Sequence, residues 1–162
     1  MAKTALLFAG QGAQTVGMGK DLAERFPTAQ ARFAQADRDL GVELSRICFA
    51  GPDTELTKSE FAQPAIYLVG WIAFELLREQ LPQLDFAATA GLSLGEFTAL
   101  AAAGALTFSD GLQVVRQRGR FMQEACDATR GGMAAILGLD EAATRAVCAE
   151  AGTELANLNC PG

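Results

Sequence analysis

The stretch Phe86–Gly104, FAATAGLSLGEFTALAAAG, decides the fold of this chain. Its short apolar start, Phe86–Ala90, predicts a buried strand, and its alanine-rich end predicts a helix. Between them, GLSLG (91–95) is the G-x-S-x-G pattern of a nucleophile elbow. A sharp strand-to-helix turn of this kind exposes the serine hydroxyl, and the flanking glycines leave room for the bend. We therefore predict Ser93 as a nucleophile and the N–H of Leu94 as an oxyanion donor.

A second glycine loop lies near the N-terminus. Thr4–Ala9 predicts a buried parallel strand, and GQGAQ (10–14) follows it. The loop fits neither the dinucleotide-binding nor the P-loop pattern, so nucleotide binding is not expected. Its backbone N–H groups could instead be oxyanion donors, with the amides of Gln11 and Gln14 beside them. For both glycine loops the alternative is a plain connection without a catalytic role.

The composition predicts one soluble domain, because the 162 residues are 50% apolar and 20% charged. A net charge of −6 argues against a nucleic-acid or membrane surface, and the longest apolar run, around Ala65–Leu77, is too interrupted to span a bilayer. No secretory signal precedes the first strand, so we expect a cytoplasmic protein. Its dispersed cysteines are expected to stay reduced and to hold no metal: they are Cys48, Cys126, Cys148 and Cys160.

Histidine is absent from the sequence. A serine nucleophile normally needs a neighbouring base, most often an imidazole, because its hydroxyl is a poor nucleophile at neutral pH. This chain cannot supply that group itself.

Helical patterns are predicted between and after the two strands. Ser59–Gln80 predicts a long helix that tolerates Pro64 near its start and places Gln63 at its mouth, either as a cap or as a pocket amide. Two more helices are expected between the first strand and this long helix. One runs from Gly17 to Phe26, and Pro27 begins the other, which Gly41 ends.

A later helix, Asp110–Ala125, carries three arginines. Arg116 and Arg120 share one face, and Arg118 points roughly the opposite way. If the shared face is solvated, Arg118 lies inward, where a buried guanidinium needs an anion. That anion is either a substrate carboxylate, bound by bidentate pairing, or a structural carboxylate of the protein.

The last part of the chain predicts a β-α-β unit after a hinge at 129–132. Met133–Gly138 and Glu154–Asn159 are the expected strands, and Glu141–Ala151 is a helix that Asp140 caps. Such a unit is half of a ferredoxin-like subdomain. The composition of residues 159–162 predicts a turn.

Three motifs in one order carry a resemblance to a known family: FAGQGAQ (8–14), GLSLGE (91–96) and QRGRFMQ (117–123), with QPA (63–65) and the asparagine-rich ending in support. The chain resembles the N-terminal part of the malonyl-CoA:acyl carrier protein transacylases of fatty acid synthesis. The resemblance implies an α/β fold: an α/β-hydrolase-like large subdomain with a parallel sheet in residues 1–128, and the start of an inserted ferredoxin-like small subdomain in 129–162.

The resemblance also implies roles for particular residues. Ser93 becomes malonylated, and the backbone N–H groups of Gln11 and Leu94 form the oxyanion hole. Arg118 binds the free carboxylate of the malonyl group, and Gln63 lies near the pocket. The implied substrates are malonyl-CoA and the phosphopantetheine thiol of acyl carrier protein, without a cofactor.

The chain departs from the family pattern in two ways. Leu92 stands where the family usually has a histidine that is not the general base, so we expect a changed pocket wall with activity retained. Family members are also expected to be about twice as long, because they have two subdomains. Their catalytic histidine follows the part that this chain matches. We expect a fragment or one half of a split enzyme, whether a natural subunit, a cleaved piece or a shortened chain.

Two other functions use the same features. A non-catalytic module would keep only the surface for coenzyme A or the carrier protein. A serine esterase or thioesterase would share the elbow, but it has no need of a buried cation such as Arg118 in its acyl pocket.

Overall fold

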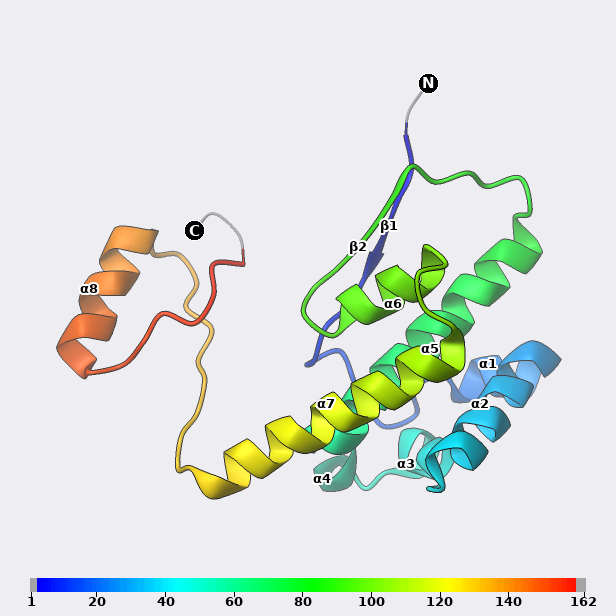
Figure 1. Ribbon diagram of the computed structural model, residues 1–162, viewed down its shortest axis with the longest axis horizontal. Coiled ribbons are helices and arrows are strands. Elements are labelled where there is room, and N and C mark those ends of the chain that lie inside the picture. The colour runs from blue at the N-terminus through cyan, green and yellow to red at the C-terminus, as the bar shows by residue number, and fades with distance from the viewer. Residues whose placement is uncertain (1–2, 160–162) are drawn as a thin grey trace. The chain divides into compact units, whose positions relative to one another are not determined.

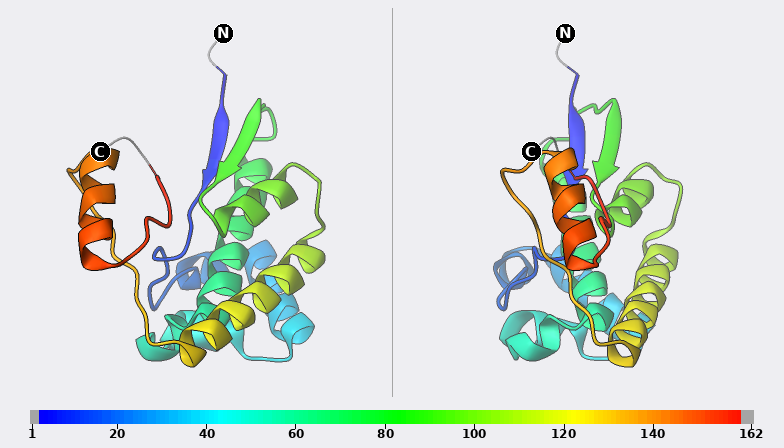
Figure 2. Two further views of the ribbon diagram at one scale, coloured as in Figure 1. Left: turned by 60° about the vertical axis from the view of Figure 1, so that its left-hand side comes forward. Right: turned by 90° about the vertical axis from the view of Figure 1, so that its left-hand side faces the viewer.

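Two parallel strands and the helices packed on one side of them position the candidate site (Figures 1 and 2). The computed structural model describes residues 3–159, which fall into two compact units on either side of the bond between Thr129 and Arg130. In chain order the elements are β1 (Ala5–Phe8), α1 (Lys20–Arg25), α2 (Pro27–Leu40), α3 (Leu44–Ala50), α4 (Asp53–Leu56), α5 (Ser59–Gln80), β2 (Ala88–Gly91), α6 (Gly95–Ala102), α7 (Phe108–Ala128) and α8 (Glu141–Ala151).

The sheet consists of β1 and β2 in the described residues, paired in parallel with Ala5 opposite Ala88 and Phe8 opposite Gly91 (Figure 2). Parallel pairing confirms the prediction for the first strand. The prediction that the strands are buried is wrong, because side chains alternate between exposed and half-buried along each strand. Phe8 packs edge-to-face on Phe74 of α5, whereas Leu7 on the opposite face is 79% exposed.

Helix α5 is the centre of the first unit, and α2, α3, α4, α6 and α7 all pack against it. Its apolar residues cover most of its circumference, which explains why it is surrounded. From Ala62 to Leu68 every residue is buried. The core around it comes from several helices: Ala29, Phe33, Leu44, Ile47, Leu56, Tyr67, Leu68, Ile72, Leu94, Leu112 and Val115.

Helices α5 and α7 cross closely (Figure 1). At the crossing, a Cβ on Gly119 would overlap the backbone carbonyl oxygen of Ser59. At the start of α7, the hydroxyl of Tyr67 donates a hydrogen bond of 3.1 Å to the carbonyl of Phe108. The missing side chain at position 119 therefore lets the helix that carries Arg118 lie directly on the start of α5.

The helix predictions are largely confirmed. The observed bounds of α5 and α8 are the predicted ones, and α2 runs from Pro27 to a left-handed Gly41. Helix α7 is longer than the predicted Asp110–Ala125 because the side chain of Thr107 accepts from the N–H of Asp110 and begins the helix earlier. The short helices α3 and α4 were not predicted.

The predicted β-α-β unit is wrong for its two strands. Helix α8 is present and Asp140 caps it, accepting from the N–H of Ala143 at 2.8 Å. Met133–Gly138 and Glu154–Asn159 have no strand structure, and no backbone hydrogen bond joins them within residues 3–159. A strand exists only where another strand satisfies its N–H and C=O groups, and these segments have no such neighbour.

Three of the four cysteines lie within the described residues. Cys48, Cys126 and Cys148 are free thiols, and burial raises the pKa of the Cys48 thiol to about 12. Cys160 and most of the predicted turn at 159–162 lie outside the described residues. Within the described part of the chain, no helix is both long and apolar enough to cross a membrane.

We predict that Gly119→Ala destabilises the first unit by about 1–2 kcal/mol. Overpacking against the Ser59 carbonyl costs about 1–3 kcal/mol, and the better helix propensity of alanine recovers part of it. Urea unfolding followed by the fluorescence of Trp71, the single tryptophan, measures the change. The control Gln117→Ala, at an exposed position of the same helix, should stay within about 0.5 kcal/mol. Equal stability of the two variants would contradict the close crossing.

Candidate active site

The elbow at the end of β2 holds its serine in a strained conformation. Ser93 has φ 53° and is the non-glycine residue with positive φ in the described chain. That left-handed conformation costs an L-residue about 1–2 kcal/mol. A Cβ on Gly91 would overlap the backbone of Gly95, and a Cβ on Gly95 would overlap the carbonyl oxygen of Phe8. The two glycines therefore permit the bend, as the motif predicts.

Both glycine loops lie at the same end of the parallel sheet. The N–H of Leu92 donates to the carbonyl of Phe8 at 3.2 Å, and Gly10 packs directly against the backbone of Leu92. Leu94 is buried and precedes α6, and no described residue accepts a hydrogen bond from its N–H or from that of Gln11. The side chain of Gln11 is held at 3.0 Å from the Ser59 hydroxyl, to which it donates. The predicted oxyanion donors thus lie on adjoining loops with their N–H groups available.

Arg118 brings three segments of the chain together. Its Nη2 donates to Ser93 Oγ at 2.8 Å, and its Nη1 donates to Gln63 Oε1 at 2.6 Å. Its guanidinium also lies over the ring of Phe97, 5.7 Å from the ring centre. The inward direction predicted from helical spacing is therefore observed, and Gln63 joins the same site.

The premise that Arg116 and Arg120 share a solvated face is wrong for Arg116. Its side chain is 15% exposed, whereas that of Arg120 is 51% exposed. Pro64 has no N–H to donate to the carbonyl of Glu60, and Arg116 Nη1 donates to that carbonyl instead. Arg116 also pairs with the Glu60 carboxylate at 3.6 Å and lies over the ring of Phe61. Burial lowers the pKa of the Arg116 guanidinium, against the raising effect of the Glu60 carboxylate.

Arg118 differs from the other half-buried arginines in its partners. Arg32 pairs with Glu75, and Arg116 pairs with Glu60. No carboxylate of residues 3–159 lies within ion-pair distance of Arg118, whose partners are an amide, a hydroxyl and an aromatic ring. The structural carboxylate that the sequence left open is thus not found among the described residues. A half-buried cation without a counter-ion suits a site that binds an anion.

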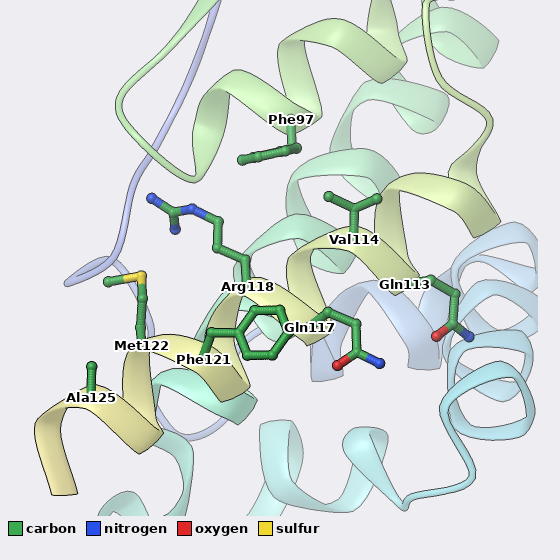
Figure 3. A pocket seen from close by; sticks show the side chains of 8 residues that line it. All are labelled: Phe97, Gln113, Val114, Gln117, Arg118, Phe121, Met122 and Ala125. Carbon is green, nitrogen blue, oxygen red and sulfur yellow. The ribbon is translucent and has the colours of Figure 1, made fainter. Parts of the chain in front are cut away.

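An open pocket of about 730 Å³ adjoins Arg118 (Figure 3). Arg118 and Met122 on α7 and Phe97 on α6 border one side of it, as Figure 3 shows. The other lining residues are Gln113, Val114, Gln117, Phe121 and Ala125. Phe97 and Met122 were not predicted. Helical spacing held a signal for Met122, which lies four residues after Arg118 and so on the same face of α7.

The site places a serine hydroxyl beside a cation, and no imidazole base lies with them in the described part of the chain. Arg118 donates to Ser93 Oγ, so it uses a lone pair of that oxygen and leaves the hydroxyl proton for another acceptor. The sequence has no histidine to accept it. Within the described residues, no group of three cysteine, aspartate or glutamate side chains is arranged to hold a metal ion.

Comparison with known proteins identifies the family of the chain. The model of the acyl transferase domain matches residues 5–157. The chain belongs to the acyl transferase domain family. Its relatives include malonyl CoA-acyl carrier protein transacylases, which confirms the resemblance drawn from the motifs. The one from Bacillus subtilis is 48% identical over all of this chain and 52% of its own length, and the one from Escherichia coli K12 is 40% identical over all of this chain and 53% of its own.

Solved structures of acyl transferases agree with the fold. The malonyl CoA-acyl carrier protein transacylase from Clostridium perfringens superimposes with a TM-score of 0.85 at 36% identity, over 99% of this chain and 52% of that one. A complex of a type II polyketide synthase acyl carrier protein with its malonyl-transacylase matches with a TM-score of 0.82 at 36% identity, over 92% of this chain and 48% of that one. The chain spans about half the length of these relatives.

The strained elbow predicts opposite effects of glycine at two serines. Ser93→Gly should be more stable than Ser93→Ala by about 1 kcal/mol, because glycine adopts positive φ freely and alanine does not. At Ser109 in helix α7 the order should reverse, since alanine favours a helix by about 1 kcal/mol over glycine. Urea unfolding of the four variants measures both differences. If Ser93→Ala were more stable than Ser93→Gly, as is expected at Ser109, Ser93 would not be held in the left-handed conformation.

Proposed function

We propose that this chain supplies the nucleophile-bearing half of a transacylase that moves a malonyl group from coenzyme A to the phosphopantetheine thiol of acyl carrier protein. The observation that supports this most strongly is the Arg118 guanidinium, 2.8 Å from Ser93 Oγ and without a carboxylate partner in the described chain. A nucleophile next to a free cation fits an acyl group that carries its own negative charge.

The first half of the reaction acylates Ser93. Its Oγ attacks the thioester carbonyl of malonyl-CoA, and the hydroxyl proton passes to a base. The tetrahedral oxyanion is stabilised by the N–H groups of Gln11 and Leu94, the latter at the positive end of α6. The oxyanion then re-forms the carbonyl, the carbon–sulfur bond breaks, and the base gives its proton to the sulfur so that coenzyme A leaves as a thiol. The product is a malonyl ester on Ser93.

The second half repeats the chemistry in reverse with a different thiol. The phosphopantetheine thiol of acyl carrier protein gives up its proton to the base and attacks the ester carbonyl. The ester bond to Ser93 breaks, its Oγ recovers the proton, and malonyl-carrier protein is released. The matched structure of a malonyl-transacylase in complex with an acyl carrier protein supports this choice of acceptor. The reaction proceeds without a cofactor.

Arg118 selects the acyl group. The malonyl carboxylate lies one methylene away from the reacting carbonyl, so a cation beside Ser93 can bind it while Oγ attacks. A charge-assisted hydrogen bond contributes about 1.5–3 kcal/mol, which corresponds to about 10- to 150-fold discrimination against an acetyl group. A hydrolase of neutral esters gains nothing from such a cation.

The base is expected from outside the chain, because relatives are about twice as long and this sequence has no histidine. We propose that residues 1–128 are the first part of an α/β-hydrolase-like subdomain that the remaining half completes. Residues 129–162 would begin a ferredoxin-like subdomain, whose strands form only with that half. The proposed setting is the cytoplasm.

A second candidate is a binding module without turnover, and the missing imidazole favours it. Such a module would keep the anion site around Arg118 and bind malonyl-CoA or malonyl-carrier protein. An experiment that supplies the missing half distinguishes the binding module from the enzyme.

The test is intact mass spectrometry after brief exposure to malonyl-CoA. The chain is measured alone and after mixing with the part of the Bacillus subtilis relative that it does not match. We expect a malonyl adduct in the mixture, mapped to Ser93 by peptide analysis and lost in Ser93→Ala, with at most slow labelling of the chain alone because removal of a triad base costs several orders of magnitude.

The same mixture is then given carrier protein with its phosphopantetheine thiol. Loss of the adduct from Ser93 together with its gain on the carrier protein supports the transacylase. Preferential binding of malonyl-CoA without an adduct in the mixture would support the binding module. An adduct on a different residue would contradict the assignment of Ser93.

A further inference from the structure

Arg118 poses a physical problem that the fold has to solve. A half-buried guanidinium needs partners, but a carboxylate partner would neutralise the charge that the substrate is to meet. Arg32 and Arg116 are fixed by the carboxylates of Glu75 and Glu60. Arg118 is instead held by neutral groups, and Gln63 makes the shortest of its contacts, at 2.6 Å.

Gln63 is fixed at both ends of its amide. It is fully buried in α5, with 0% exposure. Its Oε1 accepts from Arg118 Nη1, and its Nε2 donates to Met122 Sδ at 3.0 Å. A guanidinium can only donate, and a thioether sulfur can only accept. The direction of the amide is therefore determined chemically: the opposite orientation would place two donors together and leave the sulfur facing an oxygen.

We infer that Gln63 is a positioning residue, which holds Arg118 beside Ser93 while leaving its charge free, and that Met122 fixes the amide in the direction this requires. The inference rests on the proposed function and refines it, because Gln63 acts through Arg118 and does not itself contact the acyl group. The ring of Phe97, 5.7 Å from the guanidinium, supports the same charge without neutralising it.

Neutrality at position 63 is the property to test. Gln63→Glu keeps the size and one acceptor oxygen but adds a carboxylate against Arg118, which would form the ion pair that the wild-type site lacks. Gln63→Leu removes the contact and leaves the charge of Arg118. Met122→Leu keeps the volume and removes the acceptor that orients the amide. Gln80→Glu, at the exposed end of the same helix, adds the same charge away from the site.

The experiment measures binding of malonyl-CoA and acetyl-CoA by calorimetry, in the Ser93→Ala chain so that no acyl transfer occurs. Every contact of Arg118 given above lies within residues 63–118, so the chain contains the residues that the experiment tests. The parent is expected to bind malonyl-CoA at least about tenfold more tightly than acetyl-CoA. Gln80→Glu should keep that ratio.

Gln63→Glu should bind malonyl-CoA and acetyl-CoA about equally well. Gln63→Leu should retain part of the preference for malonyl-CoA. Met122→Leu should lower the preference for malonyl-CoA over acetyl-CoA about two- to fivefold, with an unchanged melting temperature. This variant gives a result even if a substitution at position 63 prevents folding. A preference that persists in folded Gln63→Glu, or an unchanged ratio in Met122→Leu, overturns the inference and leaves the proposed function intact. A parent chain without any preference for malonyl-CoA overturns both.

Discussion

The contacts of one guanidinium connect two helices with the elbow that carries Ser93. Arg118 on α7 donates to Gln63 on α5 and to Ser93 on the elbow after β2. Those contacts exist only because α7 lies close on α5, and the overlap that a Cβ on Gly119 would make with the Ser59 carbonyl shows how close this is. The packing of two helices thereby sets the position of a charge next to a nucleophile.

Two neighbouring arginines on α7, Arg116 and Arg118, differ in whether a carboxylate of the described chain neutralises their charge. Arg116 satisfies a carbonyl that Pro64 leaves without a donor and pairs with the carboxylate of Glu60. Its charge is used within the fold. Arg118, two residues later, has neutral partners in the described chain, so its charge is available to a ligand. The QPA sequence at 63–65 contributes to the position of both arginines. Gln63 accepts a hydrogen bond from Arg118, and Pro64 leaves a carbonyl to which Arg116 donates.

The sequence predicted the local features of the site well because those depend on short-range rules. The G-x-S-x-G spacing implied the elbow, and Ser93 has the strained conformation expected there. Helical spacing placed Arg118 inward, although the buried Arg116 showed that one premise of that argument was wrong. Phe97 became a site residue through the packing of α6 against α7, which no local pattern specifies.

The failures of prediction concern strands, whose existence depends on distant partners. The sequence predicted strands at 133–138 and 154–159, yet both segments are without strand structure where no neighbouring strand is present. Likewise Leu7 lies on an apolar strand but is exposed, because the described residues cover one face of the sheet. Both observations agree with a chain that spans about half the length of its relatives.

We propose that the Arg118 guanidinium, whose partners in the described chain are neutral, is positioned for an acyl carboxylate. Nitrogen-15 NMR of the arginine side chains tests it most directly, with the Arg118 signal assigned by its loss in Arg118→Lys. In the Ser93→Ala chain, malonyl-CoA should shift the Arg118 Nε–Hε resonance, whereas acetyl-CoA should not, and exposed Arg120 should respond to neither. An equal response of Arg118 to both thioesters, or a malonyl-specific shift at Arg120 in its place, would contradict the account.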